Sequence, residues 1–131
     1  PEIRSGTIAD AASIKLPKRI PYHIAMEMLL TGRWLNANEA NQWGFVNEVV
    51  SPEFLKERAW EIANLIASGP PLVYSAIKEV VRETENMNFL DTLNKITNRE
   101  FKTIDTLYSS EDQLEGAKAF AEKRDPVWKG R

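Results

Sequence analysis

One glutamate near the start of the chain is the first side chain that could perform acid–base chemistry. Glu2 follows Pro1. A glutamate acts as a general acid or base near neutral pH when its pocket raises its pKa toward neutrality. The alternative is an ordinary solvated carboxylate, and the residue type alone leaves both interpretations open.

The other titratable candidates indicate structure rather than catalysis. His23 is the only histidine, and no Asp, Ser or Cys stands at a catalytic spacing from it, which favours a structural or surface role. Glu111, Asp112 and Glu115 fall in the first turns of a predicted helix, where the helix dipole stabilises carboxylates. The sequence has no cysteine and no HExxH, GxGxxG, P-loop or EF-hand pattern, so no metal site is predicted.

The last part of the sequence is basic and carries an aromatic residue. Its cations surround Trp128 and are Lys118, Lys123, Arg124, Lys129 and Arg131. Cations beside an aromatic ring can bind the phosphates and the base of a nucleotide-like ligand. A solubilising helix end is the alternative, because Lys and Arg also favour helix carboxy termini.

Composition limits the classes of partner. The 131 residues are 43% hydrophobic and 27% charged, with a net charge of -2. This balance is typical of a globular protein and predicts no broad basic surface for nucleic acid or for an anionic membrane. The apolar runs are too short to span a bilayer, which needs about 20 residues. Because the sequence also lacks cysteine and an amino-terminal signal pattern, we expect a cytoplasmic protein.

Periodicity and capping residues predict a mainly helical chain of about five helices. Pro21 and Gly32 bound the first clear helix, and Asn36 with Glu39 forms a capping box for a short one that Gly44 ends. Ser51 followed by Pro52 is the strongest helix start. The remaining helices are expected at about 72–82, 88–108 and 110–121.

The last of these helices is expected to begin at a capping box formed by Ser110 and Gln113. Its predicted apolar stripe consists of Leu114, Ala117 and Phe120 with Ala121.

One segment reads as a strand. Residues 45–50, Phe-Val-Asn-Glu-Val-Val, are rich in residues that favour β-structure. A single strand cannot satisfy the hydrogen-bonding groups on its own edges. It therefore pairs with something upstream or in another chain, or it is only an extended link.

Several of these features, read in order, resemble one family. They are Leu30-Thr31-Gly32-Arg33, Ala37-Asn38-Glu39-Ala40, Gly44-Phe45-Val46-Asn47-Glu48-Val49-Val50, Pro70-Pro71 with Lys78, and Phe120-Ala121-Glu122-Lys123-Arg124. In this combination they are similar to the crotonase (enoyl-CoA hydratase/isomerase) family. The ending, residues 120–131, is similar to that of the family's carnitinyl-CoA dehydratases.

The resemblance implies a fold and a division of the chain. It implies the carboxy-terminal helical region of the ClpP/crotonase fold, without the amino-terminal ββα spiral. Residues 1–50 would then be the end of the spiral core, and residues 51–131 a helical oligomerisation domain. The sequence opens without Met, which fits a chain that begins inside a structural unit and also a complete small protein whose Met was removed before Pro1. The resemblance favours the first interpretation.

The resemblance also implies a mechanism and partners. In the family, two backbone N–H groups hold the thioester oxygen of an acyl-CoA as it becomes enolate-like, and glutamates move protons and position water. Glu2 matches a Pro-Glu of the family and is expected to be an acid/base. Lys123 matches a lysine that reaches a phosphate of CoA from a neighbouring subunit. No cofactor is implied, and the assembly would be a homo-oligomer, a trimer or hexamer in the family or a swapped dimer of this chain.

Two departures and two alternatives remain. The stretch 9–13 lacks the Pro and the Gly-Gly pair that the family commonly has after Pro-Glu, so the pocket beside Glu2 is expected to differ. The oxyanion-hole amides belong to the missing spiral, so we expect no hydratase activity from this chain alone. The alternatives to a hydratase fragment are a non-catalytic oligomerisation module and an enoyl-CoA double-bond isomerase.

Overall fold

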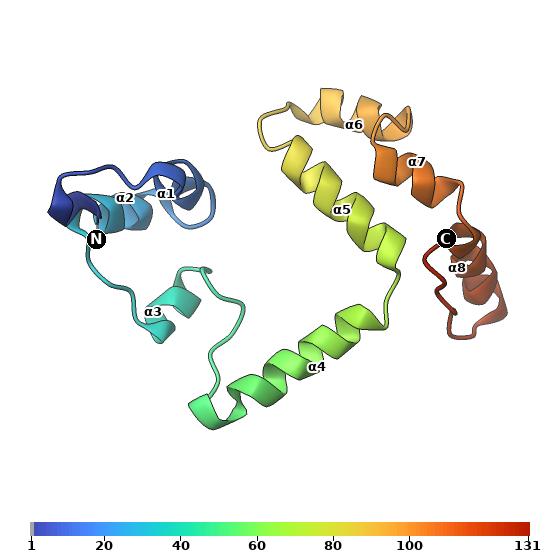
Figure 1. Ribbon diagram of the computed structural model, residues 1–131, viewed down its shortest axis with the longest axis horizontal. Coiled ribbons are helices and arrows are strands. Elements are labelled where there is room, and N and C mark those ends of the chain that lie inside the picture. Colours follow the sequence, from blue (N-terminus) through green and yellow to red (C-terminus); the bar gives the residue numbers. More distant parts are fainter. Residues whose placement is uncertain (1) are drawn as a thin grey trace. The chain divides into compact units, whose positions relative to one another are not determined.

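A computed structural model describes residues 2–131 as helices joined by loops (Figure 1). It divides into two compact units, Pro1–Arg58 and Ala59–Arg131, and each is described here by itself. The elements, with 3-10 helices labelled η, are η1 (Glu2–Ser5), α1 (Asp10–Lys15), η2 (Leu16–Lys18), α2 (Tyr22–Thr31), α3 (Ala37–Gln42), η3 (Pro52–Phe54), α4 (Leu55–Ala67), α5 (Pro71–Glu83), α6 (Phe89–Thr97), α7 (Lys102–Tyr108) and α8 (Glu111–Glu122). The mainly helical class is therefore confirmed, with more and shorter helices than the periodicity predicted.

The first unit is held by a small apolar core at the start of α2. Ile20, Ile24 and Ala25 are buried there, and Leu16 and Trp43 pack against them while remaining partly exposed. The helix ends at Gly32 as predicted, because Gly32 has φ +62°, a left-handed conformation that favours glycine.

Helix α3 begins and ends where the sequence predicted. The backbone N–H of Glu39 donates to Oδ1 of Asn36 at 2.9 Å, and the Glu39 carboxylate accepts from the Asn36 backbone N–H at 3.2 Å. Gly44, with φ +71°, lies just beyond the helix. The capping box is confirmed by these two reciprocal hydrogen bonds.

The predicted strand at 45–50 is wrong for the part of the chain that the structure describes. Residues 45–47 form bends and residues 48–50 are irregular. The backbone N–H of Phe45 turns back to the carbonyl of Ala40 at 2.7 Å, which continues the end of α3. No second strand occurs among residues 2–131 to share a ladder, so β propensity alone produces only an extended link.

The second unit is centred on the packing of α5 against α7. Ala76 of α5 is buried against Phe101 and Ile104, and Val80 and Leu107 flank this cluster. The Glu79 carboxylate of α5 accepts hydrogen bonds from the hydroxyl and the backbone N–H of Thr103. These bonds lower the pKa of Glu79 and cap the amino end of α7, whose N-cap residue supplies no side-chain hydrogen bond.

The single helix predicted for 88–108 is instead two helices. Helix α6 ends at Thr97, Arg99 adopts φ +55°, and α7 starts at Lys102. The turn between the helices directs Phe101 into the core with α5. Tertiary packing therefore overrides a periodic pattern that continues through the break.

The face of α8 that is buried is not the face the apolar pattern predicted. Ser110 caps the helix as predicted, since its Oγ accepts from the N–H of Gln113 at 3.1 Å. However, Leu114 is 70% exposed and Phe120 is 88% exposed, whereas Asp112 and Ala119 are buried. The polar side of the helix faces the end of the chain, which leaves the apolar stripe uncovered.

Large apolar side chains are exposed in both units. They include Tyr22, Leu30, Trp34, Phe54, Trp60, Leu65, Phe89, Leu90, Leu114 and Phe120. Exposed apolar surface on this scale is typical of an interaction surface rather than of an isolated monomer. None of the helices within residues 2–131 is long and apolar enough to cross a membrane.

Candidate functional site

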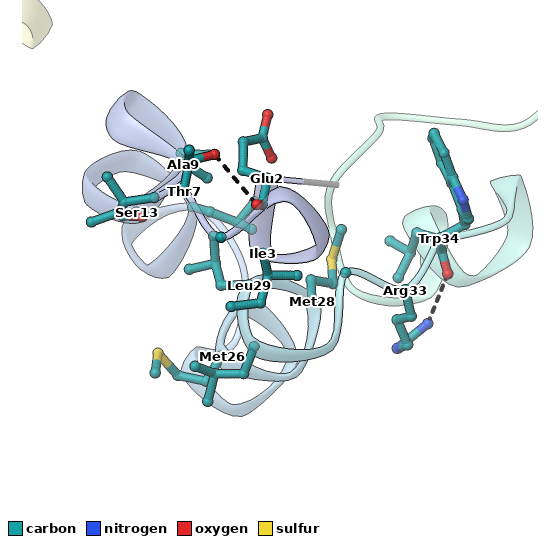
Figure 2. A pocket seen from close by; sticks show the side chains of 17 residues that line it. Glu2, Ile3, Thr7, Ala9, Ser13, Met26, Met28, Leu29, Arg33 and Trp34 are labelled. Atoms are coloured by element: carbon teal, nitrogen blue, oxygen red, sulfur yellow. Dashed lines mark hydrogen bonds between the residues drawn. The ribbon is translucent and has the colours of Figure 1, made fainter.

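A hollow of about 680 Å³ lies in the first unit, between η1, α1 and α2. Its lining is mostly apolar and comes from residues that include Ile3, Ile8, Leu16, Met26, Met28, Leu29, Leu30 and Trp34. Figure 2 shows these elements around the hollow, with Glu2 above Ile3 and its side chain extending away from Met26 and Leu29. An apolar hollow with a carboxylate at its rim can accept an uncharged, hydrophobic part of a ligand.

Local hydrogen bonds fix the backbone at Glu2. The Glu2 carbonyl accepts from the Thr7 N–H at 3.1 Å, from the Ser5 hydroxyl at 2.9 Å and from the Thr7 hydroxyl at 3.3 Å. The guanidinium of Arg4 donates to the carbonyl of Gly32 at 3.0 Å, which ties η1 to the end of α2. These contacts hold η1, and with it the backbone of Glu2, at the end of α2.

The surroundings of Glu2 favour its ionised form. The side chain is exposed, and a hydrogen bond from its own backbone N–H lowers the pKa of its carboxyl group. A general base near neutral pH would need the opposite shift, which burial produces. Within the first unit, no element covers the Glu2 carboxylate enough to raise its pKa.

Arg33 organises the far side of the hollow. Its guanidinium contacts Glu27 at 3.1 Å and Glu39 at 3.1 Å, and the hydrogen bond to Glu27 is the largest cause that raises the pKa of Arg33. Glu39 also belongs to the capping box of α3. Arg33 therefore joins the ends of α2 and α3, and sequence reasoning assigned it no such role.

Lys123 lies at the carboxy end of α8 in the second unit. It is the residue after the helix and adopts φ +55° and ψ +42°, a left-handed conformation that is uncommon for a residue with a side chain. Its side chain is exposed, and no carboxylate in the described chain pairs with its ammonium group. Glu2 belongs to the first unit and Lys123 to the second.

Two acidic residues of α8 hold the end of the chain, a role that the sequence interpretation missed. Asp112 is 3% exposed, and its carboxylate accepts from the backbone N–H groups of Lys129 at 2.7 Å and Gly130 at 2.8 Å. Glu115 accepts from both terminal nitrogens of Arg124, at 2.6 and 3.0 Å. These bonds lower the pKa of Glu115 to about 2. No sequence pattern indicated these hydrogen bonds, because they form only when the chain reverses direction after Lys123.

The remaining candidates have structural surroundings. His23 stacks edge-to-face on Trp43 with ring centroids 5.8 Å apart, as its isolation in the sequence suggested. Residues 2–131 contain no group of three or more His, Cys, Asp or Glu side chains that could hold a metal ion.

Comparison with known proteins gives a match over the whole chain. Residues 1–131 match the family described as enoyl-CoA hydratase/isomerase. Proteins named carnitinyl-CoA dehydratase are 43% identical in Citrobacter koseri and 44% identical in Salmonella typhimurium, over 132 aligned residues. These alignments cover 100% of this chain and 51% of each relative.

Solved structures agree with that match. A probable enoyl-CoA hydratase/isomerase from Mycobacterium abscessus superposes with a TM-score of 0.86 at 37% identity, covering 100% of this chain and 51% of that one. An enoyl-CoA hydratase from Bacillus anthracis gives a TM-score of 0.87 at 33% identity, covering 99% of this chain and 49% of that one. The chain thus spans about half the length of the relatives it matches.

Proposed function

Because this chain belongs to the enoyl-CoA hydratase/isomerase family, we propose that it is the carboxy-terminal part of an acyl-CoA hydratase or dehydratase. The reaction would add water to, or remove it from, the α,β double bond of a CoA thioester through an enolate. The observation that carries this proposal is the alignment of the entire chain, at 43% identity, with a carnitinyl-CoA dehydratase.

In this proposal Glu2 moves a proton or positions the reacting water. Its place at the rim of an apolar hollow supports this role, because the hollow can receive the acyl part of a thioester. The present surroundings lower the pKa of Glu2. The role therefore requires the other half of the protein to cover the carboxylate and raise its pKa.

The other half would also supply the electrophilic part of the site. Two backbone N–H donors aimed at the thioester oxygen would stabilise the enolate, and each such donor contributes about 3 kcal/mol to transition-state stabilisation. In this proposal the donors belong to a segment that precedes residue 1, as the family resemblance implies. The chain by itself would then lack the largest single contribution to catalysis.

Lys123 is proposed to contact a phosphate of the CoA carrier. Its unpaired ammonium group and its exposed position support this role. The exposed apolar stripe of α8, with Leu114 and Phe120, supports assembly with further copies of the protein. We further propose that residues 51–131 form the oligomerisation domain after the spiral segment 1–50, and that the protein works in the cytoplasm.

The test joins this chain to the part of the Citrobacter koseri relative that the alignment leaves unmatched, which we expect to be its amino-terminal half. We expect the 131-residue chain alone to show no hydration of crotonyl-CoA or crotonobetainyl-CoA and the joined protein to show turnover. Hydration by the isolated chain would overturn the expectation that it needs the other half. A folded joined protein that binds acyl-CoA and only isomerises its double bond would overturn the hydratase assignment. A joined protein that folds and assembles but neither binds nor converts acyl-CoA would favour the non-catalytic assembly module.

A further inference from the structure

At the end of α8, Lys123 forms no ion pair within the described chain, whereas each of the other cations that follow it does. Arg124 is paired with Glu115 and Glu122, Lys129 lies 3.1 Å from Glu111, and Arg131 lies 3.6 Å from the same carboxylate. Of the cations described at 123–131, Lys123 alone has no such pair. The local structure around Arg124 explains why Lys123 alone remains unpaired.

Arg124 supplies that cause in two ways. Its Nε donates to the Glu122 carboxylate at 2.7 Å, so the acidic residue next to Lys123 is already occupied. Its two terminal nitrogens form a forked ion pair with Glu115 of α8. Its backbone N–H donates to the Ala119 carbonyl at 3.1 Å. A forked arginine–carboxylate pair fixes orientation as well as distance.

Contacts on both sides of Lys123 fix its backbone. Its own N–H bonds the Phe120 carbonyl at 3.3 Å, and the next residue is anchored through the Glu115 pair. A left-handed residue with a side chain is disfavoured and persists only where its surroundings hold it. The anchoring of Arg124 therefore fixes the direction in which the Lys123 side chain leaves the helix.

We propose that Arg124 is a positioning residue for Lys123, holding the left-handed turn and engaging Glu122 so that the Lys123 ammonium is presented, unpaired, to a phosphate of the acyl-CoA. This inference rests on the proposed function, in which Lys123 contacts that phosphate. The Arg124 guanidinium itself donates to the carboxylates of Glu122 and Glu115 and to the carbonyl of Asp125.

The tail (residues 124–131) provides a separate structural support that the test must hold constant. Asp112 bonds the N–H groups of Lys129 and Gly130, and the Trp128 ring lies 3.2 Å from the position that a Cβ on Gly116 would take. These contacts do not involve the Arg124 side chain. Replacing Arg124 should therefore leave the far part of the tail attached to α8.

The test measures kcat and KM of the joined protein for crotonyl-CoA and for crotonyl-pantetheine, which has the thioester but no phosphate. We expect Arg124→Gln and Lys123→Ala each to raise KM for crotonyl-CoA about tenfold, which corresponds to one lost charge-assisted contact, with little change in kcat. Neither substitution should change KM for crotonyl-pantetheine. Arg124→Lys keeps one charge near Glu115 and should restore part of the loss.

The double variant distinguishes positioning from an independent contribution. In the Lys123→Ala background, Arg124→Gln should have almost no further effect, because the group it positions is gone. Lys56→Ala is the matched control, since Lys56 is an exposed lysine of α4 and lies outside α8 and the tail. Thermal unfolding and amide exchange at Lys129 and Gly130 verify that the variants fold and keep the tail attached.

The outcomes separate the two proposals. If Lys123→Ala leaves KM for crotonyl-CoA unchanged, the phosphate role of Lys123 is wrong, and the positioning inference for Arg124 fails with it. If Lys123→Ala raises KM but Arg124→Gln does not, or if the two effects multiply, Lys123 binds the phosphate without the help of Arg124 and the positioning inference is overturned.

Discussion

The surroundings of Glu2 and of Lys123 differ in how much of each site this chain builds. Around Glu2, hydrogen bonds fix the backbone, but the carboxylate is exposed and its pKa is lowered rather than raised. Around Lys123, two carboxylates of α8 hold the arginine and the backbone that follow it. Proton transfer needs a covered group, whereas phosphate contact needs only a well-directed cation.

The comparison shows which catalytic roles a few neighbouring residues can support and which roles need further elements. A cation can be positioned by contacts within one helix and the residues that follow it. A carboxylate with a raised pKa needs elements that remove water from several sides, and the first unit provides a rim and an open hollow but no cover. Substitutions in the two units therefore test this contrast.

Replacement of Glu2 should have the largest effect on activity. In the joined protein, Glu2→Gln removes the proposed proton acceptor and should lower kcat about 100- to 10,000-fold, while the dissociation constant for CoA stays the same. Steady-state kinetics and calorimetric titration measure the two quantities. Glu53→Gln, another exposed glutamate in the first unit, is the control. A kcat within threefold of the parent would remove Glu2 from the mechanism.

Release of the tail should have the largest effect on stability. Asp112→Ala leaves the N–H groups of Lys129 and Gly130 without their buried acceptor, and should lower the free energy of unfolding by about 2 to 3 kcal/mol. Urea denaturation of the chain measures this change. Asp125→Ala, an exposed position, should change it by less than about 0.5 kcal/mol. Equal effects would mean that the tail contacts contribute little.

A pair of glycines tests how firmly η1 is held in the first unit. Gly6 and Gly32 both have positive φ, so alanine at either should cost about 1 kcal/mol. A Cβ on Gly32 would also lie 2.9 Å from Ile3 Cγ2, whereas one on Gly6 would meet nothing within 4 Å. We therefore expect Gly32→Ala to be the more destabilising by about 1 kcal/mol in urea denaturation. It should also lower the activity of the joined protein, because η1 carries Glu2.

The reverse order, with Gly6→Ala costing more than Gly32→Ala, would show that η1 does not pack on the end of α2. Unequal stability with equal activity would show instead that the position of η1 matters for folding and not for Glu2.

The smallest effect is the pH dependence of the tail. Hydrogen bonds from Arg124 hold the pKa of Glu115 at about 2, below its ordinary value of 4.5. A group whose pKa is lowered by folding stabilises the folded state above its unfolded pKa and loses that effect as pH falls through the folded value. The protection factor of the Val127 amide, whose N–H donates to Glu115, should stay constant down to about pH 4 and fall toward pH 2. The protection factor is the quantity to compare, because intrinsic amide exchange itself varies with pH. In Glu115→Gln this pH dependence should be absent, and its persistence there would assign it to another group.

The sequence by itself determined the helices whose ends are set by local chemistry. The capping box of Asn36 and Glu39, the Gly32 ending and the Ser110 cap depend on residues within one or two turns of each other, and all three predictions are confirmed. The family resemblance likewise depended on short motifs along the chain, and the match over residues 1–131 confirms it. The assigned roles of Glu2 and Lys123 remain predictions.

Only the tertiary structure decided which faces of the helices are buried and where the chain turns. Phe101 enters the core with Ala76 because α6 and α7 separate at Arg99, although the apolar period continues across that point. The polar side of α8, not its apolar stripe, is covered, because Asp112 and Glu115 bind the returning tail. The physical reason is the same in both cases: burial depends on contacts between residues far apart in the sequence, and a local pattern cannot specify which partner arrives.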